Sequence, residues 1–366
     1  RHSFIHACIH AFMHSCIHAS FVVDMATATT LRARFADAVA RADVDVLRAR
    51  GWCVIDDFLD SRDADAFRDE LERLSDARRR DGDDDGTTTM ETRERRKYVR
   101  PNRTKFGATA VFGKPNIYEC DMHDEATLGE TRRDAAYATM WAFFDASEDG
   151  MASAFERMIP EMRLRRGETS RTVKLQVNEG RGACFPWHYD NPGPPSNRAL
   201  TCILYLNPEW RPGDGGELRV QPFCGVAATI APRHNRLAVF YSDRMLHRVT
   251  PSNARRRYCA TVWLDGDFDN STALTLNARE ALDDVEKTAE SLARGNAQRA
   301  LSRAVYADEY EASLVECMGD APGAREMLEA HYEHCRAVKK NEGLKRLVDA
   351  LREHRRDVEA REEIAV

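Results

Sequence analysis

Apolar residues in the first part of the chain recur at steps of three or four, which is the spacing of an amphipathic helix. Residues 31–47 carry this pattern, and a short apolar run at 52–55 predicts a strand after them. Phe67, Leu71 and Leu74 then mark a second helix, and residues 135–158 are helix-like again. The first part of the chain is therefore expected to be mainly helical.

The pattern changes after residue 171 to short apolar or alternating runs separated by Gly, Pro, Asn and Asp. These runs lie at 173–177, 199–206, 217–220, 237–241 and 258–264. Their rhythm is typical of an antiparallel sandwich or barrel. Beyond residue 277 the pattern is helical to the C-terminus, with breaks near Gly295, between Gly319 and Gly323, and at Gly343, which predicts about four helices.

These patterns predict an α+β protein in three parts: a support region at 25–165, a core at 166–270 and a helical extension at 276–366. The charged stretch at 81–105 is either a substrate-contacting loop or an exposed linker. Residues 1–24 place histidines four apart, which would allow a metal-binding helix face. Their near-repeats instead favour a non-structural leader, with Met25 as a natural start.

Composition limits the function classes. The 366 residues include 54 basic and 60 acidic side chains, and a formal net charge of −6 argues against a nucleic-acid partner. No apolar run is long enough for a membrane-spanning helix, so no membrane partner is expected.

Ten cysteines without a Cys-x-x-Cys pair favour neither a disulfide framework nor a zinc site, and we expect a cytoplasmic and/or nuclear protein. Four cysteines are predicted to be small buried hydrophobes: Cys184, Cys202, Cys224 and Cys259.

His188 and Asp190 are the first candidates for chemistry. They lie two apart, and on a strand that spacing points both side chains to one face. His247 is the candidate for a third ligand, whereas His234 lies in a turn and is the weaker rival. Two imidazoles and one carboxylate leave coordination positions open, as in non-haem Fe(II) oxygenases. Taken alone, His-x-Asp is more often an ordinary strand pair than a metal site.

Arg257 strengthens the metal interpretation. It opens the run Arg-Tyr-Cys-Ala-Thr-Val-Trp, and a guanidinium that enters a small barrel needs an anion because an unpaired buried charge is costly. A dicarboxylic co-substrate would supply that anion with bidentate geometry. The alternative is that Arg255, Arg256 and Arg257 form a basic surface turn.

With these residues in order, the sequence resembles the Fe(II)/2-oxoglutarate dioxygenase superfamily. The similarity is greatest to its prolyl 4-hydroxylase group, and within that group to the type that hydroxylates hypoxia-inducible transcription factor. It runs through His-Tyr-Asp-Asn-Pro at 188–192, Thr-Cys-Ile-Leu-Tyr-Leu-Asn at 201–207, Gly-Gly-Glu-Leu-Arg at 215–219, Ser-Asp-Arg at 242–244, and on to Thr-Val-Trp at 261–263.

The resemblance implies a double-stranded β-helix, or jelly-roll, core. It implies Fe(II) held by His188, Asp190 and His247, with O2 and 2-oxoglutarate as co-substrates and ascorbate as the reductant. It also implies that the distal carboxylate of 2-oxoglutarate pairs with Arg257 and Tyr205. Two further residues are candidates for the co-substrate site: Thr261, whose hydroxyl lies on the face of Arg257, and Asn178, which stands where the oxygen-sensing enzymes have a tyrosine.

The activity expected from the resemblance is hydroxylation of a proline in a protein or peptide partner, with 2-oxoglutarate and O2 converted to succinate and CO2. Two alternatives remain: a related oxygenase that acts on another side chain or a small molecule, and a non-catalytic scaffold that binds a metal or a peptide. Three aromatic residues are candidates for the substrate wall, although each is equally suited to the core: Trp187, Tyr189 and Trp263.

Overall fold

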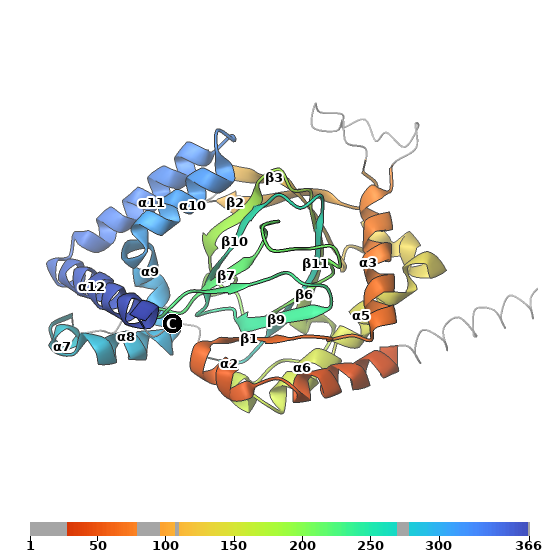
Figure 1. Ribbon diagram of the computed structural model, residues 1–366, viewed down its shortest axis with the longest axis horizontal. Helices are drawn as coiled ribbons and strands as arrows, with labels where there is room; N and C mark the ends of the chain where they lie inside the picture. Colours follow the sequence, from red (N-terminus) through yellow and green to blue (C-terminus); the bar gives the residue numbers. More distant parts are fainter. Residues whose placement is uncertain (1–27, 79–95, 107–109, 269–277, 365–366) are drawn as a thin grey trace, which may run out of the picture.

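The computed structural model describes residues 28–78, 96–106, 110–268 and 278–364. The expected leader at 1–24 and most of the charged stretch at 81–105 lie outside these residues. Two antiparallel sheets face each other, one of seven strands in the order β1-β9-β6-β11-β4-β3-β2 and one of four in the order β5-β10-β7-β8 (Figure 1). This arrangement confirms the double-stranded β-helix that the sequence resemblance predicts.

The strands of the large sheet include every apolar run that the sequence predicted as a strand except the one at 217–220. They are β1 (Trp52–Ile55), β2 (Arg100–Phe106), β3 (Ala110–Asp121), β4 (Arg171–Asn178), β6 (Arg198–Tyr205), β9 (Arg236–Tyr241) and β11 (Arg257–Asp265). The small sheet contains β5 (Ala183–His188), β7 (Leu218–Gln221), β8 (Ala228–Ile230) and β10 (Leu246–Ser252).

Strand β11 shows how the sequence separates the two faces of the large sheet. Side chains alternate along a strand, so Tyr258 and Val262 join the apolar layer under the helices, whereas Cys259 joins the cluster between the two sheets. Arg257 and Trp263 have the parity of Cys259. The chemically distinctive residues of this strand therefore face the interior of the β-helix.

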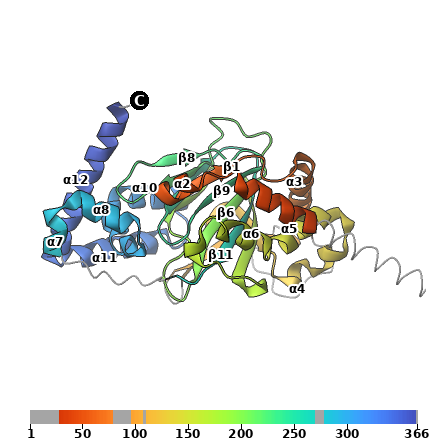
Figure 2. The same ribbon diagram turned by 90° about the horizontal axis from the view of Figure 1, so that it is seen from below.

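Helices of the N-terminal half cover the outer face of the large sheet, and their apolar sides pack on it in one cluster (Figures 1 and 2). The single helix expected at 31–47 is two helices, because Asp43 caps the second one through a hydrogen bond from Val46 N to its carboxylate, 3.0 Å. The helices are residues 28–40, α2 (Val44–Arg50), α3 (Ser61–Asp76), α4 (Glu125–Leu128), α5 (Ala138–Ser147) and α6 (Gly150–Glu156), with short 3-10 turns at Gly129–Arg133, Ala135–Tyr137, Pro160–Met162 and Glu168–Ser170.

The C-terminal helices lie on the opposite side of the β-helix (Figures 1 and 2). Trp187 and Leu246 of the small sheet join their apolar cluster. The described part of the extension has six α-helices where the sequence predicted about four, since short turns divide the periodic stretches: α7 (Ala278–Asp283), α8 (Val285–Ala293), α9 (Arg299–Val305), α10 (Ala307–Met318), α11 (Ala324–Lys339) and α12 (Glu342–Ile364), with a 3-10 turn at Asn296–Gln298. In the described part of the chain, no helix combines the length and apolar character that crossing a bilayer requires.

Two further sequence expectations are wrong. Part of the predicted charged loop is strand β2, which pairs with β3 in a hairpin that the sequence analysis did not predict. Cys184 is not a free buried thiol, because it forms a disulfide with Cys317, Cα–Cα 5.4 Å. Helix α10 packs on β5 and brings the two cysteines together although 133 residues separate them. Six other cysteines among the described residues are free and buried.

Candidate metal and co-substrate site

His188, Asp190 and His247 form a compact group in which one potential ligand atom from each residue lies within 4.8 Å of the others. Paired strands carry the two histidines, since His188 ends β5 and is the register partner of His247 on β10. Asp190 follows β5 in a bend rather than within the strand. The rival histidine, His234, instead lies beside Asp65, Nε2–Oδ1 2.9 Å.

Backbone carbonyls set the orientation of both imidazole rings. Nδ1 of His188 lies 2.8 Å from the carbonyl oxygen of Pro186, and Nδ1 of His247 lies 3.1 Å from that of Met245. In a neutral imidazole only the protonated nitrogen can donate to a carbonyl oxygen. These contacts therefore place the proton of each neutral ring on Nδ1. Each Nε2 is then left with a lone pair, and both Nε2 atoms face Oδ1 of Asp190, at 3.5 and 3.6 Å.

The carboxylate of Asp190 is held from the opposite side. Its Oδ2 accepts hydrogen bonds from Oγ1 of Thr201 and from the indole Nε1 of Trp263, both at 2.9 Å. Thr201 Oγ1 also lies 2.7 Å from Ser242 Oγ. One carboxylate oxygen is thus fixed by the protein, and the other remains directed toward the two imidazoles. Such outer hydrogen bonds orient metal ligands and maintain their affinity.

The pKa values favour the protonation states that a metal requires. Burial and the neighbouring His188 ring lower the pKa of His247 to about 4, although Asp190 acts in the opposite direction. Burial alone would raise the pKa of Asp190, but His247, His188 and the Trp263 hydrogen bond outweigh it and hold the pKa well below its usual value. The donor set is therefore a neutral imidazole at His247 and an ionised carboxylate, which fits Fe(II).

Arg257 is buried at the first residue of β11, the end of the strand away from Trp263. Its Nε donates to the carbonyl of Gly216, 2.8 Å, and its Cζ lies 4.9 Å from the ring centroid of Tyr205. Gly216 provides the space, since a Cβ there would come within 2.8 Å of Arg257 Cδ. In the part of the chain that the structure describes, no carboxylate pairs with this guanidinium. The hydroxyl of Tyr205 is buried and has no hydrogen-bond partner among the described residues.

This pocket fits one end of a dicarboxylate. Burial raises the pKa of Tyr205, so its phenol stays protonated and can donate. A buried guanidinium and an unsatisfied phenol O–H together offer the charge and the donors that a carboxylate needs. The residues present therefore fit 2-oxoglutarate, whose distal carboxylate Arg257 and Tyr205 would hold.

Two neighbouring strands join the anion pocket to the metal site. On β6, Thr201 contacts Asp190 and Tyr205 contacts Arg257. On β11, Arg257 lies at the first residue and Trp263 reaches Asp190. The period of two thus places both groups of residues on the interior face of the same sheet.

The other two residues predicted for the co-substrate site differ in their surroundings. Thr261 is 4% exposed and shares the interior parity of Arg257 on β11. Asn178 is used elsewhere: its Nδ2 donates to the carbonyl of Ala183, 3.1 Å, and its Oδ1 accepts from Gly180 N, 3.0 Å. Both polar groups of this amide therefore stabilise the turn between β4 and β5.

The three candidates for the substrate wall also have different surroundings. Trp263 supports Asp190. Trp187 packs among the C-terminal helices, and its backbone N–H donates to Ser313 Oγ, 3.2 Å. The hydroxyl of Tyr189 lies 2.6 Å from Ser302 Oγ and 3.1 Å from Gln298 Oε1. Trp187 and Tyr189, which flank His188, are therefore anchored in the helical extension.

The polar wall beside the metal site was not predicted. Glu119 of β3 lies inside the β-helix, 2.9 Å from Lys174 Nζ, and accepts from Asn102 at 2.6 Å and from Gln176 at 3.1 Å. Lys114 donates to Asn102 Oδ1, 3.0 Å. The only signal in the sequence was the alternation of polar residues in β4 at 172, 174, 176 and 178.

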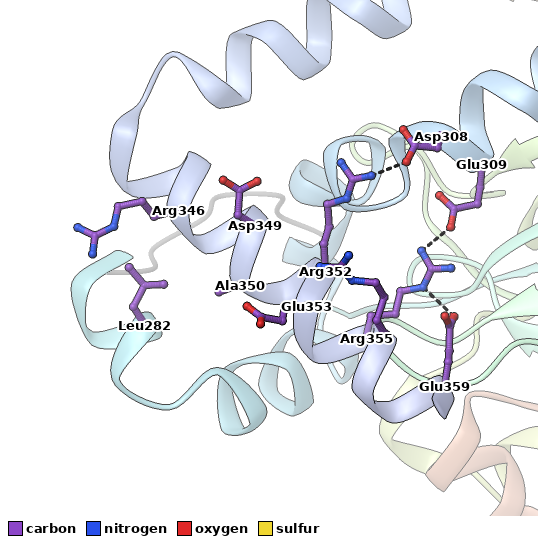
Figure 3. Close-up of a pocket in the computed structure, with 11 residues that line it drawn as sticks. Leu282, Asp308, Glu309, Arg346, Asp349, Ala350, Arg352, Glu353, Arg355 and Glu359 are labelled. Atoms are coloured by element: carbon purple, nitrogen blue, oxygen red, sulfur yellow. Dashed lines mark hydrogen bonds and ion pairs between the residues drawn. The ribbon is translucent and has the colours of Figure 1, made fainter. Parts of the chain in front are cut away.

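A wide groove lies apart from this site, in the helical extension between α7, α10 and α12 (Figure 3). Its volume is about 810 Å³, and its walls are mostly charged. Arg352 pairs with Asp308 at 2.5 Å, and Arg355 pairs with Glu309 at 2.5 Å and Glu359 at 2.8 Å. These side chains satisfy one another, so the groove adds no chemistry to the metal site.

Comparison with known proteins agrees with this geometry. Residues 173–265 match the family model described as the 2OG-Fe(II) oxygenase superfamily, a range that contains the His/Asp/His group and Arg257. A solved structure described as a prolyl 4-hydroxylase from Phytophthora capsici is 34% identical, covers 88% of this chain and 95% of its own, and superimposes with a TM-score of 0.68.

Curated relatives are similar in sequence to this chain over part of their own length. Egl nine homolog 1 of Rattus norvegicus is 30% identical over 224 residues, which are 60% of this chain and 56% of the relative. Hypoxia-inducible factor prolyl hydroxylase of Caenorhabditis elegans is 28% identical over 261 residues, 68% of this chain and 30% of the relative. The chain thus spans about half or less of these relatives. Taken with the fold and the site, these similarities show that the chain belongs to the 2OG-Fe(II) oxygenase superfamily, in its prolyl 4-hydroxylase group.

Proposed function

We propose that this protein is an Fe(II)- and 2-oxoglutarate-dependent dioxygenase that hydroxylates a proline in a protein or peptide, as a prolyl 4-hydroxylase. The observation that carries the proposal is the placement of a His/Asp/His group and a buried Arg257–Tyr205 pocket on one interior surface. Bound there, iron and 2-oxoglutarate supply the activation of O2 that oxidises an unactivated C–H bond, with succinate and CO2 as products.

The residues of the chain bind, orient and exclude water. His188, Asp190 and His247 would hold the iron, and Thr201 and Trp263 fix the carboxylate of Asp190. Arg257 and Tyr205 would hold the distal carboxylate of 2-oxoglutarate, and Thr261 lies further along the same interior face of β11. A buried apolar cluster lies between the sheets and keeps the pocket dry: Ile203, Leu218, Val220, Ile230, Ala238 and Phe240.

The substrate class rests on the relatives. Two of the similar proteins are named as prolyl hydroxylases, and the name of one of these two includes hypoxia-inducible factor. We infer a proline-containing protein or peptide as the partner and ascorbate as the reductant that keeps the iron in the ferrous state. An oxygenase for another side chain or a small molecule, and a non-catalytic scaffold, are the alternatives that the experiment must separate.

The test is an anaerobic titration of the purified protein with Fe(II) and 2-oxoglutarate, followed by O2 and a panel of proline-containing peptides. We expect a metal-to-ligand charge-transfer band, and then succinate in proportion to hydroxyproline. Succinate without peptide oxidation would reject the substrate class and retain the oxygenase. Absence of both the band and succinate would favour the scaffold.

For the compartment, we propose the cytoplasm and/or the nucleus, because the resemblance is to oxygen-sensing enzymes and six described cysteines are free. The Cys184–Cys317 disulfide is the observation against a strongly reducing compartment. Alkylation of thiols in intact cells, followed by mass spectrometry of the two cysteines, tests whether the disulfide is present there.

A further inference from the structure

Cys259 lies beside the Arg257–Tyr205 pocket, two residues after Arg257 on the interior face of β11. It is 2% exposed, and its register partners are Tyr205 on β6 and Gln176 on β4. Tyr205 joins it in the apolar cluster between the two sheets. The thiol is therefore a neighbour of both residues that would hold the distal carboxylate of 2-oxoglutarate.

The sulfur atom of Cys259 contacts a polar side chain on each side. Nη1 of Arg257 donates to Sγ at 3.7 Å, and the thiol donates to Oε1 of Gln176, also at 3.7 Å. Gln176 is held in turn, because its Nε2 donates to Glu119 at 3.1 Å. A thiol is both a weak donor and a weak acceptor. Cys259 thus links the guanidinium to the polar wall on β3 and β4.

The protonation state of the thiol fits both contacts. Burial raises the pKa of Cys259, although Arg257 and Thr261 act in the opposite direction. The sulfur therefore keeps the hydrogen that Gln176 accepts, and its lone pairs face the guanidinium.

The contacts of Arg257 leave one edge of its guanidinium for an anion. Two pairs of parallel N–H groups can bind a carboxylate bidentately, Nε with Nη2 and Nη1 with Nη2. The carbonyl of Gly216 occupies the first pair, since it accepts from Nε at 2.8 Å. Nη1 carries two hydrogens, so a bond to Cys259 leaves the other hydrogen for the second pair.

Gly216 and Cys259 together fix the plane of this guanidinium. One holds Nε and the other holds Nη1, so the group is restrained at two of its three nitrogens. A side chain that is already oriented loses less conformational freedom when it binds its ligand. This arrangement should therefore strengthen binding of the distal carboxylate.

We propose that Cys259 is a positioning residue that orients the Arg257 guanidinium for the distal carboxylate of 2-oxoglutarate. The inference rests on the proposed function, because it takes 2-oxoglutarate as the co-substrate. Cys259 acts through Arg257, so its loss should weaken co-substrate binding and leave the metal ligands unchanged.

The test compares Cys259→Ala with Cys259→Ser, two variants of similar side-chain volume that differ by a hydroxyl. Anaerobic titrations of the Fe(II) protein, followed by the charge-transfer band, give the Kd of 2-oxoglutarate. The same titrations give the Kd of 2-oxovalerate, which has a methyl group in place of the distal carboxylate. We expect Cys259→Ala to bind 2-oxoglutarate about fivefold more weakly and 2-oxovalerate as the wild-type protein does. Cys259→Ser restores a donor and an acceptor, so its Kd for 2-oxoglutarate should lie within about twofold of the wild-type value.

Cys202→Ala is the matched control. Cys202 is also a free buried cysteine, but it lies in the apolar layer on the outer face of the same sheet, so this variant should bind both ligands as the wild-type protein does. Competition with a chelator and thermal unfolding check the iron site and the fold of each variant. At saturating 2-oxoglutarate, Cys259→Ala should keep the wild-type kcat, while its KM for 2-oxoglutarate rises as the Kd does.

Three results would overturn the inference: wild-type affinity for 2-oxoglutarate in Cys259→Ala, equal weakening of both ligands in that variant, or a Cys259→Ser variant that binds no better than Cys259→Ala. The proposed function still stands in each case if the wild-type protein oxidises proline peptides. If the wild-type protein gives no band with 2-oxoglutarate, both fail. If it gives the band but oxidises no proline peptide, the substrate class fails and the affinities still decide the role of Cys259.

Discussion

The indole nitrogen of Trp263 donates a hydrogen bond to Oδ2 of Asp190 at 2.9 Å. This contact fixes the carboxylate that the two imidazoles face, which is a role that the sequence did not predict for the tryptophan. Thr201 makes an equivalent contact from the neighbouring strand. Iron affinity should therefore depend on residues that do not touch the metal.

Trp263→Phe tests this dependence. The phenyl ring retains most of the packing but cannot donate to Asp190, so we expect Fe(II) affinity to fall by about 10- to 100-fold. Competition with a chromophoric chelator under anaerobic conditions measures this affinity. Trp52→Phe, on β1, is the matched control and should leave it unchanged. An Fe(II) affinity in Trp263→Phe equal to that of the wild-type protein would show that the hydrogen bond is dispensable.

His247→Ala and Arg257→Ala should fail in different ways. The first removes a proposed ligand, so we expect loss of iron and of turnover. The second removes the cation of the anion pocket, so we expect iron binding to persist while the KM for 2-oxoglutarate rises by about two orders of magnitude. Iron content and KM are measured in parallel, with Arg219→Ala, an exposed residue of β7, as the control. Equal iron loss in both variants would mean that Arg257 supports the metal rather than the co-substrate.

Tyr189→Phe tests the anchoring of the metal-binding strand to the extension. The variant loses the hydroxyl contacts to Gln298 and Ser302. We therefore expect the free energy of unfolding, measured by urea denaturation, to fall by about 1 kcal/mol. Tyr332→Phe, whose hydroxyl binds Glu311 on the surface, serves as the control and should have little effect. A Tyr189→Phe variant as stable as the wild-type protein would show that these contacts are not needed.

Much of the core was predictable because its signals are local. Alternation in 258–264 and 199–206 predicts strands, and the resemblance supplied the order of His188, Asp190, His247 and Arg257. In the structure, one potential ligand atom from each of the three candidate metal ligands lies within 4.8 Å of the others.

The remaining features depend on pairings between distant segments. Strand β2 has few apolar residues, and the hairpin contributes Asn102, Lys114 and Glu119 to the polar wall of the site, so β2 did not look like a strand in the sequence. Cys184 and Cys317 meet only after α10 packs on β5. The role of Asn178 was also inaccessible, since its amide binds backbone groups of the following turn.

The interior side of β11 holds Arg257 at its first residue and Trp263 six residues later. Because side chains alternate strictly, losing or gaining a single residue between them would send one of the two to the helix-covered surface. The number of residues between these two positions therefore fixes the distance from the Arg257 pocket to the Asp190 carboxylate, and a co-substrate that bridged the pocket and the metal would have to match that distance.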